Sequence, residues 1–239
     1  MGLTDQVLPP GSRVTSVSAH GASFWAKIYK LDVVFVDNKK PCSYFMKVSE
    51  CDIGLGMVMG EYNGASALHR IIPDRNTSEP VAWGTYVKDP TKHFFLAIFR
   101  DIKDEMPPGD KFTSRLVHLH QSSVSPTGKF GFPTSSWQGT SCLDTSWCDT
   151  WEEFFTRTFR SSINFESSVH GQTAEIDDLA EKMITKVIPR LIRPLETGGK
   201  SIKPCLCHGD LWHGNVGVDR NTNEPIIFDP CCVYAHYEC

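Results

Sequence analysis

Several features that assign a chain to a protein class are missing from this sequence. No apolar run approaches the roughly 20 residues that a membrane-spanning helix needs, and the first residues have neither the basic start nor the apolar segment of a signal peptide. A net charge of −4 gives no overall attraction to nucleic acid or to an anionic membrane. There is no internal repeat and no low-complexity tract. We therefore expect a cytoplasmic globular protein that binds neither nucleic acid nor membranes.

None of the nine cysteines forms a Cys-x-x-Cys pair, and this absence argues against a structural zinc site. The nearest arrangement combines Cys205-x-Cys207 with Cys231-Cys232, which is one conceivable metal site. Small buried hydrophobic side chains in a reducing cytosol are the favoured interpretation. The odd number of cysteines and the missing signal peptide also argue against a disulfide framework.

The most informative stretch lies near the end of the chain, where His208-x-Asp210 is followed by Asn215 and then by Asp229 on an apolar strand. Asp229 lies 19 residues after Asp210, which suits a short hairpin between them. Protein-kinase-like folds divide their chemistry in this way. Their first aspartate receives or orients the proton of the attacking hydroxyl, while the asparagine and the second aspartate hold Mg²⁺ on the nucleotide phosphates. The pattern therefore indicates phosphoryl transfer.

Two upstream residues fit the same chemistry. Lys47 closes the apolar strand Tyr44–Val48, which is the pattern of the phosphate-pairing lysine of kinases. Glu61 follows 14 residues later on the first predicted helix, Met57–Ile71, where such folds take the carboxylate that pairs with the lysine. An edge lysine reaching solvent and a solvated helix glutamate are the alternatives. A kinase-type phosphotransferase is favoured over a non-catalytic relative because all these residues occur in the required order.

Two further segments indicate where a nucleotide would bind. The segment Ser18–Ser23 falls between two predicted strands and contains Gly21, so its backbone N–H groups can cover phosphates. With a single glycine, an ordinary hairpin turn is the alternative. The apolar strand His93–Phe99 runs into a polar linker, where kinase-like folds hold the adenine through backbone groups. We place this contact at Ala97, Phe99 and their neighbours.

The remaining pattern predicts an α+β fold in two lobes. Strands are expected at 14–19, 24–29, 31–36, 42–48, 81–87 and 93–99, with a turn at 37–41. Helices are expected at 57–71, 111–121, 151–160 and 173–195, the last kinked or ended by Pro189 and Pro194. The composition becomes polar at 100–105, which marks the boundary between an N-lobe sheet with its helix (1–100) and a mostly helical C-lobe (101–239).

The motifs resemble those of the fructosamine kinase family, also called ketosamine-3-kinases or protein-ribulosamine 3-kinases. The resemblance is carried by His208–Gly217, by Phe228–Pro230, by Ser125–Gly131 and by Trp147–Phe155, and it extends from about Lys47 to the C-terminus. These motifs are more specific to one family than the general kinase pattern is. Aminoglycoside and choline kinases share the two aspartates and the asparagine, but not Asp-Leu-Trp before Gly-Asn-Val-Gly.

The resemblance implies a two-lobed protein-kinase-like fold that uses ATP and Mg²⁺. It implies phosphorylation of the sugar 3-hydroxyl of ketosamines on protein amines, after which the unstable product falls off. The expected substrates are glycated proteins or small glycated amines. For the oligomeric state, monomer and dimer are both left open. Carried over by motif, the roles are Asp210 as base, Asn215 and Asp229 as Mg²⁺ ligands, Lys47 and Glu61 at the phosphates, and Trp212 with His213 at the sugar.

Three departures from the family pattern stand beside this resemblance. His213 occupies a position where the family usually has Ser or another residue, and the loop around Gly21 is poor in glycine. The chain ends ten residues after Asp229, whereas the family continues for several helices. We therefore expect a C-terminally shortened member with reduced stability. The alternatives are a small-molecule kinase of the aminoglycoside or choline type, and a non-catalytic nucleotide-binding relative.

Overall fold

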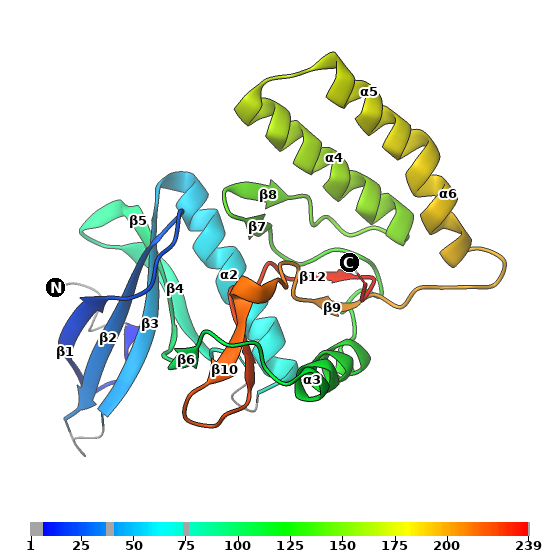
Figure 1. The fold of residues 1–239 in the computed structure, drawn as a ribbon. Coiled ribbons are helices and arrows are strands. Elements are labelled where there is room, and N and C mark those ends of the chain that lie inside the picture. Colours follow the sequence, from blue (N-terminus) through cyan, green and yellow to red (C-terminus); the bar gives the residue numbers. More distant parts are fainter. Residues whose placement is uncertain (1–6, 37–40, 74–76, 239) are drawn as a thin grey trace.

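The computed structural model describes residues 7–36, 41–73 and 77–238. The predicted turn at 37–41 lies almost wholly outside these ranges, as does the N-terminal stretch that lacks a signal-peptide pattern. Figure 1 shows a twisted sheet formed by the first part of the chain, with helix α2 lying between this sheet and the mostly helical remainder. No helix among the described residues combines the length and the apolar character needed to cross a membrane.

Five antiparallel strands form the N-terminal sheet, in the order β1-β2-β3-β5-β4. Their bounds are Ser12–Ala19 (β1), Lys27–Phe35 (β2), Pro41–Glu50 (β3), Pro80–Tyr86 (β4) and Asp89–Ile98 (β5). The expectation of separate strands at 24–29 and 31–36 was wrong, because β2 is one continuous strand. Lys30 interrupts the apolar run in the sequence, but in the strand it faces the side opposite the buried Leu31 and Val33.

The sheet has an apolar core on each face. The first core contains Leu8, Leu31, Val33, Tyr44, Met46, Val48, Phe94 and Leu96. The second, between the sheet and helix α2 (Cys51–Ile71), contains Val58, Ala65, Phe95 and Ala97. Because side chains alternate along a strand, Lys47 lies on the same face of β3 as Phe45, which packs against this second core. The sheet therefore presents Lys47 to helix α2.

Helix α2 begins at Cys51, six residues before the predicted start at Met57. The sequence pattern missed the first turns because Gly54 and Gly56 fall there, and glycine has a low intrinsic helix propensity. Packing against the sheet stabilises these turns in spite of that propensity, since Gly54 is buried.

Glycines at positions 56, 60 and 64 are four residues apart, so they form a stripe along one side of α2, here called the glycine stripe. A Cβ atom on Gly56 would lie 2.5 Å from the Trp137 ring, and one on Gly60 would lie 2.7 Å from the Ser135 carbonyl oxygen. The stripe therefore allows the second half of the molecule to approach α2 more closely than any larger residue would permit.

The remainder of the chain combines helices with short strand pairs. The helices are α3 (Gly109–Ser122), α4 (Trp151–His170), α5 (Ala174–Lys182) and α6 (Ile188–Ile192), and the strands are β6 (Ile102–Lys103), β7 (Ser136–Gln138), β8 (Ser141–Leu143), β9 (Cys205–Cys207), β10 (Val216–Asp219), β11 (Pro225–Ile227) and β12 (Val233–Ala235). Strand β10 pairs with β11 and β6, β9 pairs with β12, and β7 pairs with β8. The predicted hairpin between the catalytic motif and Asp229 is β10–β11.

Two predicted helices differ from the structure. Helix α4 extends to His170, ten residues past the expected end, because the polar stretch 161–168 hides the apolar pattern. The helix expected at 173–195 is divided by one π-helical turn, Met183–Val187, and finishes in the 3-10 turn Arg193–Leu195. The π turn ends just before Pro189, which has no N–H for the α-helical bond. The expected kink therefore takes the form of a π turn.

The largest core joins α3, α4 and α6 to the central strands β9 and β12. Cys205, Cys207, Cys231 and Cys232 are all buried in this region. No group of three His, Cys, Asp or Glu side chains within the described ranges is arranged to hold a metal ion. The burial of these cysteines agrees with their interpretation as small hydrophobic side chains.

Candidate functional site

Lys47 contacts one carboxylate from α2 and another from the second half of the molecule. Its Nζ lies 2.9 Å from Oε1 of Glu61, and it also contacts Oδ1 of Asp229, which follows β11. The side chains of Lys47 and Glu61 are only 12% and 13% exposed, whereas that of Asp229 is 49% exposed. The structure thus brings together three residues singled out from the sequence, although Lys47 and Asp229 are 182 positions apart.

Burial and charge together set the protonation of this triad. Burial lowers the pKa of Lys47, but the carboxylates of Glu61 and Asp229 outweigh burial and hold that pKa above its ordinary value. Burial raises the pKa of Glu61 to about 7, against the opposing effect of Lys47. Burial also acts to raise the pKa of Asp229, but the Lys47 ammonium lowers it below its ordinary value. Lys47 is therefore cationic, and Asp229 keeps its negative charge as the pH falls.

Asp210 and Asn215 form a second pair in the catalytic loop, defined here as His208–Asn215 between β9 and β10. Asn215 Nδ2 donates to Oδ2 of Asp210 at 2.9 Å and to the Asp210 carbonyl oxygen at 2.8 Å. Burial raises the pKa of Asp210, the hydrogen bond from Asn215 lowers it, the charge of Asp229 raises it, and the net shift is upward. The Asp210 carboxylate therefore takes up a proton more readily than an ordinary aspartate.

The β10–β11 hairpin connects these two groups of residues. The Phe228 N–H donates to the Asn215 carbonyl oxygen at 3.1 Å, where the two chains of the hairpin meet. Asp229 follows directly and has a φ of +58°, in the left-handed region that non-glycine residues rarely adopt. Such a conformation persists only where the surroundings impose it. The contact with Lys47 is one such constraint.

Asn215 and Asp229 fit a hard divalent cation. They supply an amide oxygen and carboxylate oxygens, which are the ligands that Mg²⁺ prefers. The Asn215 amide nitrogen is turned toward Asp210, so its oxygen is turned away from Asp210. Mg²⁺ in phosphotransfer sites commonly takes one or two protein ligands and completes its shell with water and substrate phosphates. A pair of side chains is therefore sufficient in such a site.

His208 holds the catalytic loop against the segment that follows β11. Its Nε2 donates to the Phe228 carbonyl oxygen at 3.0 Å, and its Nδ1 accepts from the Asp210 N–H at 3.4 Å. Its carbonyl oxygen accepts from the Cys231 N–H at 2.9 Å. Burial lowers the pKa of His208 to about 4, although the hydrogen bond to Phe228 and the charge of Asp229 act in the opposite direction. The imidazole is therefore neutral near pH 7, with its proton on Nε2.

Gly209 makes this close contact possible. It has a φ of +80°, and a Cβ atom there would lie 1.9 Å from the Cys231 carbonyl oxygen. Neither His208 nor Gly209 is assigned a role of its own from the sequence. Their signal was the His-Gly-Asp motif itself, but their partners Phe228 and Cys231 lie on either side of Asp229, and no local pattern indicates that pairing.

Trp212 and His213 lie on the exposed side of the catalytic loop. Their rings are in edge-to-face contact with centroids 4.6 Å apart, and Trp212 is 53% exposed. A Cβ atom on Gly214 would lie 2.4 Å from the Trp212 ring, so the ring folds over this glycine. The Trp212 N–H donates to the Asp210 carbonyl oxygen at 3.1 Å. An exposed aromatic surface therefore lies two residues from Asp210.

Three residues predicted to contact a nucleotide lie outside these groups. Gly21 is in the loop between β1 and β2 and has a φ of +68°. Ala97 is fully buried in β5, between β3 and β4. The N–H of Phe99 donates to the Ser43 carbonyl oxygen at 2.9 Å, so a base cannot use that group. The adenine contact around Ala97 and Phe99 stays a prediction.

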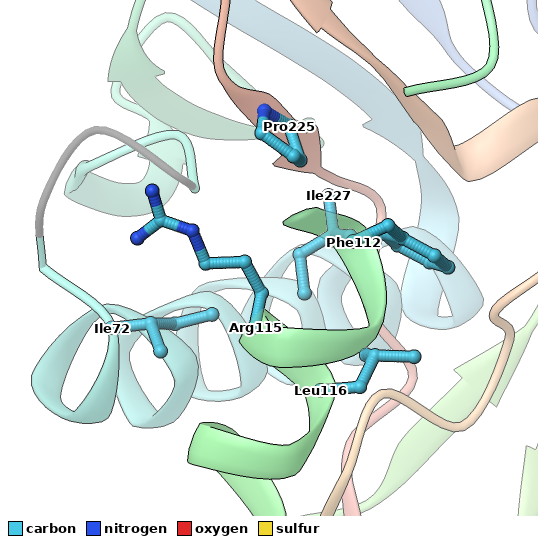
Figure 2. Close-up of a pocket in the computed structure, with 6 residues that line it drawn as sticks. All are labelled: Ile72, Phe112, Arg115, Leu116, Pro225 and Ile227. Atoms are coloured by element: carbon cyan, nitrogen blue, oxygen red, sulfur yellow. The ribbon is translucent and has the colours of Figure 1, made fainter. Parts of the chain in front are cut away.

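The cavity shown in Figure 2 lies apart from these residues. It is lined by Ile72, Phe112, Arg115, Leu116, Pro225 and Ile227, at the junction of α2, α3 and β11. The lining is almost entirely apolar, and the Arg115 guanidinium is 3.0 Å from the Glu224 carboxylate. Without convergent polar groups, this cavity is a packing gap rather than a site of chemistry.

Comparison with known proteins identifies a family and relatives. The family model described as fructosamine kinase matches residues 27–239. The chloroplastic protein-ribulosamine 3-kinase of Oryza sativa subsp. japonica is 30% identical over 236 residues, which cover 95% of this chain and 61% of the rice protein. The chain thus spans less than two thirds of the length of this relative.

Solved structures show the same fold. A candidate fructosamine-3-kinase from Thermobifida fusca superposes with a TM-score of 0.70 at 21% identity, covering 95% of this chain and 72% of that chain. An aminoglycoside phosphotransferase in a ternary complex with AMP-PNP and hygromycin B gives a TM-score of 0.60 at 10% identity, covering 94% and 70%. These likenesses confirm the predicted two-lobed, protein-kinase-like α+β fold. Because the family model covers residues 27–239, the chain belongs to the fructosamine kinase family.

Proposed function

We propose that this protein is an ATP-dependent kinase that phosphorylates the sugar 3-hydroxyl of ketosamines on amines. Membership of the fructosamine kinase family and the name of the rice relative support this activity. The observation that carries the proposal is the contact of Lys47 with both Glu61 and Asp229, beside the hydrogen-bonded pair of Asp210 and Asn215. These five residues make up the set that phosphoryl transfer requires.

Asp210 is the proposed catalytic base. Its carboxylate accepts the proton of the sugar 3-hydroxyl as the hydroxyl oxygen attacks the γ-phosphorus of ATP. A new oxygen–phosphorus bond forms, the bond from the γ-phosphorus to the β–γ bridging oxygen breaks, and ADP leaves. The hydrogen bond from Asn215 orients the carboxylate, and the raised pKa of Asp210 favours its uptake of the proton.

The remaining groups bind and orient the nucleotide. Asn215 and Asp229 would hold Mg²⁺, which would neutralise the charge that develops on the phosphates. Lys47 pairs with the phosphates, and Glu61 keeps the lysine in place. The backbone around Gly21 covers the phosphates, and backbone groups around Ala97 and Phe99, other than the Phe99 N–H, contact the base.

The acceptor side is proposed to lie at the exposed aromatic surface of the catalytic loop. The face of Trp212 suits a sugar ring rich in C–H groups, and His213 lies beside it. The substrates are glycated proteins or small glycated amines. The lobe boundary after residue 100 and the cytoplasmic location stay predictions; the rice relative is named as chloroplastic.

A substrate panel on the purified full chain tests the proposal. We expect Mg·ATP-dependent phosphorylation of fructosyl-lysine or ribulosyl-lysine, and no turnover in Asp210→Ala. Transfer only to an aminoglycoside or to choline would favour the small-molecule kinase. Stabilisation of thermal unfolding by Mg·ATP without transfer to any acceptor would favour the non-catalytic relative. Turnover that persists in Asp210→Ala would show that Asp210 is not the catalytic base.

A further inference from the structure

The β7–β8 hairpin contacts three different parts of the proposed site through three consecutive residues, the last two of β7 and the first of the turn. Trp137 packs on the glycine stripe of α2, the helix that carries Glu61. The Gln138 side-chain amide donates to the Gly209 carbonyl oxygen of the catalytic loop at 2.8 Å. Gly139 lies under the indole of Trp25, which belongs to residues 20–26, here called the β1–β2 loop.

The contact between Gly139 and Trp25 requires glycine. Gly139 has a φ of +57°, and a Cβ atom there would lie 2.9 Å from Nε1 and 3.0 Å from Cε2 of Trp25. The hairpin beneath is itself anchored, because the buried Ser136 hydroxyl donates to the Cys232 carbonyl oxygen at 2.6 Å. The indole therefore packs on a fixed part of the second half of the molecule.

The contact is limited in extent. Trp25 is still 54% exposed, and the neighbouring Phe24 is 97% exposed. A contact between one half-exposed indole and a glycine is weak enough for this part of the β1–β2 loop to lift and return. The same loop contains Gly21, so the contact of Trp25 with Gly139 limits where the backbone of the loop can lie.

We propose that Trp25 is a positioning residue for the nucleotide. By packing on Gly139, Trp25 holds the β1–β2 loop against the β7–β8 hairpin. The same hairpin is hydrogen-bonded to the catalytic loop through Gln138. The backbone N–H groups of the loop then lie where they can receive phosphate oxygens. This inference rests on the proposed function only in that the loop covers a nucleotide, and it is independent of the acceptor.

Hydrogen exchange of the full chain tests the contact without nucleotide or acceptor. Gly139→Ala drives a methyl group into the Trp25 indole. Gly198→Ala is the matched control, because Gly198 has a φ of +65° and no atom within 4 Å of the added Cβ. Both variants bear the same left-handed backbone strain. We expect amide exchange across residues 20–26 to rise about fivefold in Gly139→Ala only. Equal exchange in the two variants would overturn the contact.

Titration with Mg·AMP-PNP tests the positioning. We expect Trp25→Ala to weaken binding about fivefold, since one aromatic contact then no longer holds the loop in place. Phe24→Ala removes the adjacent exposed ring and is expected to change affinity less than about twofold. Equal effects of the two substitutions, or none in Trp25→Ala, would overturn the proposal. Wild-type protein that binds no Mg·AMP-PNP contradicts the proposed function as well, while hydrogen exchange still decides whether the contact exists.

Discussion

The Lys47 ammonium lies 2.9 Å from the Glu61 carboxylate and contacts Asp229 at the same time, so two carboxylates share one buried cation. Lys47→Met leaves these carboxylates next to each other without the cation. Breaking a buried ion pair typically costs about 3–5 kcal/mol. We expect a decrease of this order in the free energy of unfolding, measured by urea titration.

Two comparisons separate this effect from a general loss of charge. The exposed pair of Lys27 and Glu50 gives the matched control, Lys27→Met, with an expected change of at most about 1 kcal/mol. The double variant Lys47→Met/Glu61→Gln is expected to be more stable than Lys47→Met, because the buried Glu61 carboxyl then neither carries an unpaired charge nor has to take up a proton to lose it. A decrease at Lys47 no larger than that at Lys27 would contradict the buried ion pair of Lys47 and Glu61.

His208 is expected to make stability depend on pH. Its pKa is about 4 in the folded protein against an ordinary 6.5, so the unfolded chain binds the extra proton first. The contribution of neutral His208 is fully present above pH 6.5 and is lost as the pH falls toward 4, and its size is on the order of 3 kcal/mol. Urea unfolding at a series of pH values measures it.

The control for this titration is His208→Gln, which keeps a donor for the Phe228 carbonyl oxygen but does not ionise in this range. We expect its free energy of unfolding to fall less steeply than that of the wild type between pH 6.5 and 4. Parallel curves for the two proteins would show that His208 is not held neutral by its surroundings.

Gly209→Ala is expected to unfold the catalytic loop. The added Cβ would lie 1.9 Å from the Cys231 carbonyl oxygen, in addition to the strain of a φ of +80°. Gly128→Ala is the matched control, because Gly128 has a φ of +71° with open space around the added Cβ. We expect the control to lose about 1–2 kcal/mol and Gly209→Ala to lose clearly more. Similar unfolding curves would argue against the close contact.

Trp212→Ala is expected to affect the acceptor and not the nucleotide. Trp212 is 53% exposed, so its removal leaves the core intact, and the lost stacking surface should raise the KM for a ketosamine about tenfold. Trp83→Ala, at a tryptophan on β4 that is 36% exposed, serves as the control. The KM for Mg·ATP should stay unchanged in both variants. An unchanged ketosamine KM in Trp212→Ala would place the sugar elsewhere.

The family and the protein-kinase-like fold were predictable because their signals are local. His208, Asp210 and Asn215 lie in one short loop, and Lys47 and Glu61 lie on a strand and the helix that directly follows it. The comparisons confirm the family and the fold. The roles given to these residues are not tested by the geometry alone, and they stay predictions until the variants are measured.

Other parts of the site depend on contacts that no local pattern indicates. Gln138 reaches Gly209 across 71 positions, and the partner of Gly139 is Trp25, from the opposite half of the chain. The start of α2 was missed for a related reason. Glycine has a low helix propensity, so the sequence pattern argues against a helix there. In the structure, Gly56 leaves the space that the Trp137 ring occupies.

The glycine stripe of α2 also limits how this molecule can be regulated. Protein kinases control activity partly by moving the helix that carries the lysine-pairing glutamate. Here that helix has almost no gap between its backbone and the segment Ser135–Trp137, and tilting it would open a void in a close-packed seam. Movement of α2 is therefore poorly suited to switching activity on and off in this protein. The β1–β2 loop, whose Trp25 ring packs on Gly139, is better placed to respond to a ligand.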